Sequence, residues 1–558
     1  MHYTTVGSLI KKIRTDKKIT RKNLAYGICS EHTLGEIEAD KYVTDILMID
    51  ILLQRLGKSP DKFEMVLSKE VYQMVKIRDL IEKMILQGKR DLAEKMLHRY
   101  PLRTNIDKMY QYRMRASLLY YIDKNFQEAA DSLKRAILIT LPDFLDDISF
   151  FNNLDTLLIS SIEMENLLAL ERLNIENIYE KKGIKEKTKK HLEQYMNYIN
   201  FHFAGDEEYA KLCSKCAWLL GRICYFEDRY FEVMVLCEKG LEGLRKNTIL
   251  YFMLPLLELM VKAERALKIA PEQSKWMKYY EVIFFIWKGY AEKWYPIDSL
   301  FHNCYQREYH LDYELIRAER KAQEITQNEL ATDIYQNPES LSRVESGKVS
   351  PNKKSFEKLM VRLGIDKCRY NGYIATDSFE VMELKRTVDQ LVMRRDYKEA
   401  KEVVQELNNK LDMRIAENRM VIGLYENVIE KHLGKIVAKE ALEKLEILAQ
   451  SFIDIETKTF SHIPMRNEVA LINNICLNLI DIGQKEEALE LYKVTLQKMK
   501  NSKVHIKYRY RSYALLLNNY VRSNKNIKSA LEELQNELLC GKAMEFSLCL
   551  NNILQILY

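Results

Sequence analysis

Glycine and proline are scarce in this chain, with 18 and 9 among 558 residues, whereas 30% of the residues are charged. A composition with so few helix-breaking residues, rich in Leu, Ile, Lys and Glu, favours helices, so we expect an all-α protein. The chain is too long for one hydrophobic core, and three or four units are expected. The formal net charge of +6 is a weak bias. Any affinity for nucleic acid must therefore come from local patches.

Signatures of catalysis, metal binding and membrane insertion are also missing. The sequence has no Gly-rich phosphate loop, no HExxH and no GxSxG, and its ten His residues lack the spacing of metal ligands. Cys213 and Cys216 form a CxxC without a second one, which favours two thiols on one helix face over a zinc site. The N-terminal stretch has no apolar core of signal-peptide length, and residues 282–287 are too few to span a bilayer. We predict a cytoplasmic protein that is not an enzyme and needs no cofactor or metal.

Residues 326–351, TQNELATDIYQNPESLSRVESGKVSP, have the pattern of two short helices joined by a tight turn. Thr326 is a preferred N-cap for the first helix. Asn337 is a preferred N-cap for the second, with Pro338 at its first position, where a missing N–H costs nothing.

The second of these helices has an apolar side and a polar side. Leu341 and Val344 lie three positions apart and are expected to face inward. Gly347 is expected to take the left-handed conformation that ends the helix. The polar side then carries Glu339, Ser340 and Arg343, with Ser342 on its flank. Such an exposed helix has the size to enter a major groove, where short polar side chains reach base edges.

The motifs TQxELA and SLSRxExGKxxP resemble those of Cro and lambda-repressor type helix-turn-helix domains, the XRE family, over residues 315–363. The resemblance implies double-stranded DNA as a partner and a pairing of Arg320 with Glu345. It also implies that Gln327 contacts a phosphate and braces the second helix. The residues expected to bind DNA are Thr326, Gln327, Asn337, Glu339, Ser340, Ser342, Arg343 and Lys348. The alternative is a pair of ordinary helices within a helical array.

The same pattern occurs near the start of the chain. Six residues between Leu9 and Ala25 recur 306 positions later, and six between Leu34 and Gly57 recur 307 positions later. The second offset continues to Ala93, which matches Ala400. Because the match extends beyond a common motif, we interpret it as an internal duplication.

The first copy is less regular than the second. Ser30 can cap its exposed helix, and Leu34 and Ile37 can face inward, but Glu36 stands where the second copy has Arg343. A carboxylate near phosphates weakens binding unless it accepts from a cytosine amino group. The residues expected to bind DNA here are Thr20, Arg21, Lys22, Ser30, His32 and Thr33. A domain that only packs or dimerises is an equally open interpretation.

A periodic helical region follows each copy. Residues 112–139 have the pattern of a helix, a turn at 123–125 and a second helix with small Ala residues, and residues 469–500 repeat it with Gly483 in the turn. Helical hairpins with a period near 34 resemble tetratricopeptide repeats. We predict two helix-turn-helix domains of five-helix type at 1–67 and 307–370, each followed by an α-solenoid, at 70–304 and 375–558.

The concave side of such an array suits an extended peptide. Asn side chains both donate to and accept from a peptide backbone, and the candidates for this role are Asn473, Asn474, Asn518 and Asn519. The alternative is that these residues make hydrogen bonds at the surface or between repeats.

The order of helix-turn-helix and tetratricopeptide repeats resembles that of the Rgg, PlcR and PrgX group. That resemblance implies a cytosolic transcription regulator that responds to a short signalling peptide in quorum sensing. Two helix-turn-helix units in one chain leave open a homodimer or an intramolecular pseudo-dimer, whose half-sites would lie about 34 Å apart or a multiple of it. One alternative is a protein-binding scaffold whose helix-turn-helix modules do not bind DNA. Another is a phage-type or toxin-system repressor that has no peptide ligand.

Overall fold

The computed structural model describes residues 6–39, 45–63, 65–145, 147–177, 182–247, 249–291, 301, 307–323, 325–363, 374, 376 and 378–524. These residues are mainly helical, which confirms the all-α class. No helix within the described residues is both long and apolar enough to cross a membrane.

Four short helices begin the chain: α1 (Val6–Asp16), α2 (Arg21–Ala25), α3 (Glu31–Glu38) and α4 (Ile46–Arg55), together called the N-terminal unit. The hydroxyl oxygens of Thr20 and Ser30 begin α2 and α3 by accepting from the backbone amides of Asn23 and Thr33, at 3.1 and 3.0 Å. The cap predicted at Ser30 is therefore confirmed. A short turn, η1 (Pro60–Lys62), leads to strand β1 (Met65–Leu67).

The first helical array follows. Its helices are α5 (Lys69–Leu86), α6 (Arg90–Arg99), α7 (Asn105–Leu118), η2 (Leu119–Asp123), α8 (Phe126–Thr140), η3 (Pro142–Leu145), α9 (Asp147–Asn152), η4 (Leu154–Thr156), α10 (Ser161–Asn177), α11 (Lys182–His202), α12 (Glu207–Phe226), α13 (Tyr230–Lys246), α14 (Met253–Ala266), η6 (Pro271–Gln273), α15 (Lys275–Ile286) and η7 (Trp287–Ala291). The helices α7 and α8 pack as a hairpin, as do α12 and α13. The turn predicted at 123–125 is confirmed by the left-handed Lys124, and Ala129 and Ala136 are fully buried on α8.

A second set of four helices is preceded by strand β2 (Tyr309–Leu311): α16 (Asp312–Ala322), α17 (Gln327–Ala331), α18 (Pro338–Glu345) and α19 (Lys353–Arg362). We call α16–α19 the C-terminal unit. Its core, which includes Leu315, Leu341 and Leu359, is separate from the main core of the molecule.

The second array contains α20 (Phe379–Arg394), α21 (Tyr397–Lys410), α22 (Ala416–His432), α23 (Ala438–Ala449), α24 (Arg466–Asp481), α25 (Lys485–Lys500), η9 (Ile506–Arg509) and α26 (Tyr510–Ser523). Strands β3 (Ile453–Asp454) and β4 (Thr459–Phe460) form an antiparallel pair between α23 and α24. The predicted turn at Gly483 is confirmed by its φ of +90°. Residues 525–558 of the predicted array lie outside the described residues.

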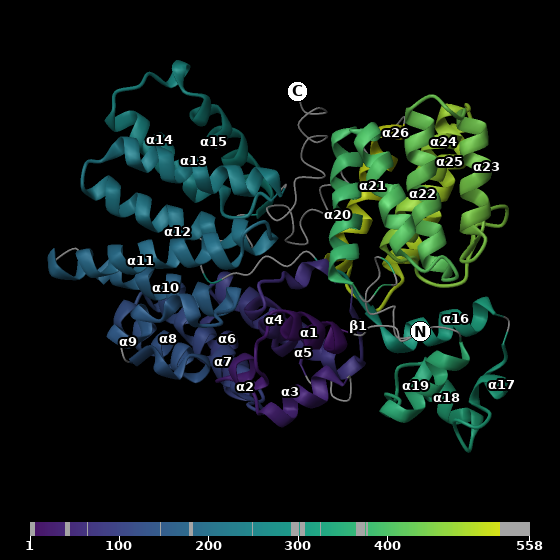
Figure 1. Ribbon diagram of the computed structural model, residues 1–558, viewed down its shortest axis with the longest axis horizontal. Coiled ribbons are helices and arrows are strands. Elements are labelled where there is room, and N and C mark those ends of the chain that lie inside the picture. Colours follow the sequence, from purple (N-terminus) through teal and green to yellow (C-terminus); the bar gives the residue numbers. More distant parts are fainter. Residues whose placement is uncertain are drawn as a thin grey trace.

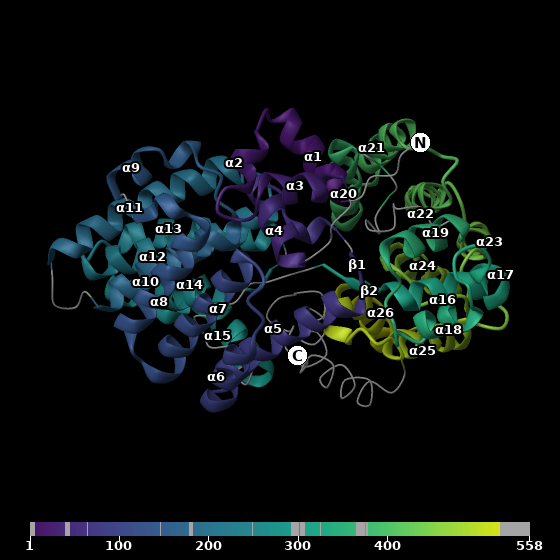
Figure 2. The same cartoon turned by 90° about the horizontal axis from the view of Figure 1, so that it is seen from below.

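The two four-helix units lie on the same side of the molecule. Figure 1 shows α3 and α18 at its lower edge, and both are in open view when the molecule is seen from below (Figure 2). Strand β1 pairs in parallel with β2, with Met65 opposite Tyr309. The end of the N-terminal unit is thereby joined to the start of the C-terminal unit.

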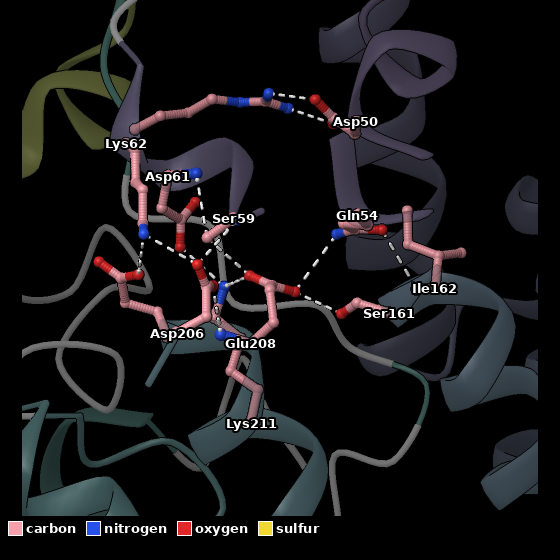
Figure 3. Close-up of polar contacts among 12 residues, drawn as sticks. Asp50, Gln54, Ser59, Asp61, Lys62, Ser161, Ile162, Asp206, Glu208 and Lys211 are labelled. Carbon is pink, nitrogen blue, oxygen red and sulfur yellow. Dashed lines mark hydrogen bonds and ion pairs between the residues drawn. The ribbon is translucent and has the colours of Figure 1, made fainter. Parts of the chain in front are cut away.

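A buried polar cluster holds the N-terminal unit against the first array (Figure 3). The Lys211 ammonium donates to Asp61 and Glu208 at 2.7 and 2.8 Å, and the Ser59 hydroxyl donates to Glu208 at 2.8 Å. Lys62 makes an ion pair of 2.8 Å with Asp206. Buried charges persist only when they are paired and hydrogen-bonded, so this cluster fixes how α4 and η1 meet α12.

Candidate nucleic-acid interface

The caps of α17 and α18 are those expected from the sequence. The Thr326 hydroxyl accepts from the backbone amide of Glu329 at 3.2 Å, and the Glu329 carboxylate accepts from the amide of Thr326 at 2.7 Å. This reciprocal arrangement satisfies two amides at the start of α17. At α18, the side-chain oxygen Oδ1 of Asn337 accepts from the backbone amide of Glu339 at 2.9 Å, and Pro338 occupies the first position.

Helix α18 is anchored on one side and exposed on the other. Leu341 and Val344 are 0% and 1% exposed in the core of the C-terminal unit. Gly347 ends the helix with a φ of +67°, and the Tyr313 ring lies directly against it. Of the residues predicted to bind DNA, Gln327 and Ser340 are half-buried, while Thr326, Asn337, Glu339, Ser342, Arg343 and Lys348 are exposed.

A buried carboxylate ties α18 to α16 and α17. Glu345 is 4% exposed, and it accepts from Arg320 Nε at 2.6 Å and from Arg320 Nη2 at 3.0 Å. Gln327 Nε2 donates to the same carboxylate at 2.7 Å. Three donors compensate the cost of burying this charge. The predicted pairing of Arg320 with Glu345 and the bracing role of Gln327 are confirmed, whereas the phosphate contact of Gln327 stays a prediction.

A family model described as helix-turn-helix matches residues 316–368, which cover α17, α18, α19 and most of α16. This part of the chain is an XRE-type helix-turn-helix. No curated protein and no solved structure matches the chain.

The N-terminal unit contains the same brace as the helix-turn-helix. Arg14 makes a two-pronged pair with Glu38, with one contact at 3.0 Å, and Arg14 Nη1 donates to the Ile19 carbonyl at 2.8 Å. Arg320 Nη1 donates to the Ile325 carbonyl at 2.7 Å. Arg21 reaches Glu38 at 2.8 Å, at the position that Gln327 occupies in the helix-turn-helix.

Two further contacts recur at matching positions. Lys17 donates to the Leu56 carbonyl at 2.8 Å, and Gln323 donates to the Leu363 carbonyl at 2.6 Å. The guanidinium of Arg55 donates to the carbonyl after α2 at 2.6 Å, and that of Arg362 to the carbonyl after α17 at 2.5 Å. The helices also have the same lengths in order, 11, 5, 8 and 10 residues.

The exposed side of α3 differs in charge from that of α18. Glu36 lies where α18 has Arg343, and its carboxylate is 3.9 Å from the His32 ring. The guanidinium of Arg21 is occupied by Glu38, although 43% of the side chain is exposed. Of the residues predicted to bind DNA, Thr33 is half-buried, while Thr20, Arg21, Lys22, Ser30 and His32 are exposed.

Helix α4 is buried on all sides, which the sequence reasoning missed. Arg55, 1% exposed, donates to Glu163 of the first array at 3.0 and 2.6 Å and to the Thr140 carbonyl at 3.0 Å. The run ILMIDILLQR was a usable signal, because apolar residues at nearly every position indicate a helix covered on all faces.

The four Asn residues predicted to bind a peptide all lie on α24 and α26. The side-chain oxygen Oδ1 of Asn473 accepts from the Tyr492 hydroxyl at 3.2 Å and from Asn519 Nδ2 at 2.7 Å. Asn474 donates to a carbonyl of its own helix at 2.8 Å, and Asn518 is 8% exposed. The bonds of Asn473 join neighbouring helices and agree with the alternative of internal hydrogen bonding, and contact with a peptide stays a prediction.

The CxxC is likewise part of the packing. Cys213 and Cys216 are fully buried, and Cys216 Sγ donates to the Leu192 carbonyl at 3.3 Å. Among the described residues, no group of three or more His, Cys, Asp or Glu side chains is arranged to hold a metal ion.

Proposed function

We propose that the chain is a sequence-specific DNA-binding regulator of transcription and that α18 enters the major groove. The observation that carries this proposal is the combination of an exposed polar side on α18 with an inward side fixed by Leu341, Val344 and the braced Glu345. A reading helix must be open to the groove and rigid beneath it. Catalytic activity forms no part of the proposal.

The residues predicted to bind DNA on α17, α18 and the cap between them divide into two roles. Arg343, with Gln327, anchors the helix to phosphates. Asn337, Glu339, Ser340 and Ser342 reach base edges, which carry the sequence information. The Arg343 side chain has no hydrogen bond or ion pair with any described residue, so it is available to a phosphate.

In this proposal the N-terminal unit and the C-terminal unit are the two copies of an internal duplication. The matching brace, the matching carbonyl contacts and the equal helix lengths support a common origin for the two units. The chain then supplies an intramolecular pseudo-dimer, and its unlike helices α3 and α18 recognise unlike half-sites. The alternative is a homodimer of such chains, and a measurement of the oligomeric state in solution distinguishes the two.

The helical hairpins of both arrays support a tetratricopeptide-like architecture, and control by a short peptide is the proposed use of that architecture. The buried bonds of Asn473 and Asn519 mean that a peptide would have to contact other atoms of α24 and α26 or displace these bonds. Co-purification of a peptide with the chain, followed by mass spectrometry, tests this part independently of DNA binding.

A scaffold that binds other proteins is the second candidate function. The observations that favour it concern the N-terminal unit, namely the burial of α4 and the carboxylate of Glu36 on α3. A mobility-shift assay against genomic fragments separates the two functions, because a scaffold gives no sequence-selective complex.

The direct test of the groove-binding model is a salt titration of the Arg343→Ala variant on a bound DNA fragment. Loss of one phosphate contact weakens binding to all sequences and reduces the salt slope by about one unit. Lys439→Ala is the matched control, because Lys439 is an exposed cation on α23, remote in sequence from α18. Unchanged affinity and salt slope for Arg343→Ala would contradict the model.

A further inference from the structure

Residues Met65–Glu70, which we call the strap, link the two four-helix units. The strap comprises β1, Ser68 and the first two residues of α5. Its strand pairs with β2 directly before α16, and the Val66 side chain lies in the core of the helix-turn-helix with Leu315 and Leu341. A residue from the first half of the chain therefore completes the core of a domain in the second half.

The strap also holds the end of α18. The Lys69 ammonium donates to the Gly347 carbonyl at 2.6 Å, and a cation at a helix C-terminus is favoured by the helix dipole. The adjacent Glu70 accepts from the Ser350 hydroxyl at 2.7 Å. Both contacts fall on the turn that leads out of α18, so the strap fixes the position of this helix relative to α5.

A buried ion pair connects the N-terminal unit to the same region. Asp50 on α4 pairs through both oxygens with Arg307, which directly precedes Glu308 and β2. The Asp50 and Arg307 side chains are 1% and 3% exposed, and dashed lines in Figure 3 mark the contacts of Asp50. Arg307 Nε also donates to the Tyr309 hydroxyl at 2.8 Å. Breaking a buried pair on one side leaves an uncompensated charge, so this contact resists rearrangement.

We propose that the strap and the Asp50–Arg307 pair hold α3 and α18 in one relative orientation, so that the chain selects DNA with two half-sites at a single spacing. This inference rests on the proposed function. Lys69, Glu70 and Asp50 are positioning residues in this inference, because the contacts described above join them to protein groups, through which they place α18 and α3.

A rigid link makes spacing a specificity determinant for a physical reason. One added base pair shifts a half-site by about 3.4 Å along the helix axis and turns it by about 34°. Two DNA-binding units on a flexible linker adapt to an inserted base pair at little cost in affinity, because only the effective concentration of the second unit changes. Two DNA-binding units held in one rigid body cannot adapt, so an inserted base pair removes the DNA contacts of one unit.

The experiment begins with selection of bound sequences from a pool of random duplexes by the full chain. Binding is then measured on the selected site and on versions with one, two or five base pairs inserted between the half-sites. For the wild type we expect affinity to fall about tenfold or more with one or two inserted pairs.

The test variant is Lys69→Ala with Glu70→Ala, which removes both polar contacts to the turn after α18. We expect it to bind the selected site less tightly and to lose less affinity on insertion, so that the penalty for altered spacing shrinks several-fold. The matched control is Lys398→Ala with Glu399→Ala, the same residue pair in the first turn of α21, exposed and without a partner among the described residues. Ser350→Ala removes the Glu70 contact alone and serves if the double variant does not fold.

Three results would overturn the inference. Selected sequences with a single half-site would show that the two units bind independently. A wild type that loses no more affinity on insertion than the strap variants would show that the strap does not set the spacing. Both results leave the proposed function intact. Failure of the pool to enrich any sequence would instead remove the proposed function itself.

Discussion

Glu345 is the side chain that fixes the geometry beneath α18. Its carboxylate joins three helices, because α18 carries it, α16 supplies Arg320 and α17 supplies Gln327. The N-terminal unit places Glu38 between Arg14 and Arg21 in the same way. A charge with donors from two neighbouring helices restricts where α18 can lie, and Glu38 restricts α3 in the same way.

Replacement of Glu345 by Gln is expected to loosen the helix-turn-helix. The change leaves Arg320, whose side chain is 11% exposed, without a counter-charge, and breaking such a pair costs about 3–5 kcal/mol. Hydrogen exchange of α18 amides in the full chain measures this as faster exchange. The control is Glu339→Gln, the same chemical change on the exposed side of α18. Equal protection of α18 in the two variants would contradict the bracing role.

Asp312, the first residue of α16, gives the stability a pH dependence. Burial raises the pKa of Asp312 to about 7, and nearby Glu70 adds to the shift. The folded state therefore holds this proton more tightly than the unfolded state, whose Asp side chains titrate near pH 4. As the pH rises from about 4 to about 7, ionisation of this group therefore lowers the free energy of unfolding by up to about 1.4 kcal/mol per pH unit.

The Asp312→Asn variant is expected to melt at a higher temperature than the wild type at pH 8 and at a similar temperature at pH 5. The amide keeps an oxygen that accepts from the Tyr313 amide, now 2.7 Å from the carboxylate, and it cannot ionise. Other buried groups titrate in this range, so the difference between the two proteins is the relevant quantity. Asp16→Asn, at an exposed position on α1, controls for the loss of charge. A constant difference between pH 5 and pH 8 would argue against a buried, proton-binding Asp312.

At the scale of elements, the end of α18 depends on a glycine. Gly347 has a φ of +67°, and a Cβ there would lie 2.9 Å from the Tyr313 ring. Gly347→Ala is therefore expected to cost about 1–3 kcal/mol of strain and to disturb the bond to Lys69. Gly434→Ala is the control, because Gly434 has a φ of +71° with open space around it. Thermal unfolding should separate the two, and equal losses would mean that the ring contact is unimportant.

The last residues of α4 and α19, Arg55 and Arg362, allow a second comparison between the two units. Arg55 and Arg362 make the same bond to the carbonyl after α2 and α17, but only Arg55 is buried against Glu163. Arg55→Met should release the N-terminal unit from the first array and cost about 3–5 kcal/mol, whereas Arg362→Met should cost about 1 kcal/mol or less. Limited proteolysis of residues 6–63 measures the release, and equal resistance in both variants would contradict it.

Local patterns predicted α17 and α18 and the caps of these two helices. Thr326, Asn337, Pro338 and Gly347 each act through contacts within a few residues, so their roles can be read from spacing. The Arg320–Glu345 pair came from the family resemblance, because nothing in the spacing alone joins those two residues.

The sequence patterns did not predict the packing between segments that are distant along the chain. The burial of α4, the insertion of Val66 into the C-terminal core and the Asp50–Arg307 pair join segments that lie far apart along the chain. Periodicity identifies which face of a helix is apolar and leaves open which surface covers it. The Asn residues of α24 and α26 were ambiguous for the same reason, since an amide suits a peptide and a neighbouring helix equally well.

At the scale of the whole molecule, the two units on one side and the arrays beside them form a connected body (Figure 1). The strap, the buried Asp50–Arg307 pair and the bond of 2.7 Å between Lys62 and Glu383 all cross from the first half of the chain to the second. A change in either array is therefore expected to reach α18 through packed elements rather than through a loose linker.

The measurement that tests the central claim most directly is selection of DNA from random duplexes by the wild type and by the Ser340→Ala, Ser342→Ala double variant. The account predicts that the wild type enriches a defined sequence and that the variant retains binding with a relaxed preference at the positions facing α18. No enrichment by the wild type, or an identical sequence from both proteins, would contradict the account.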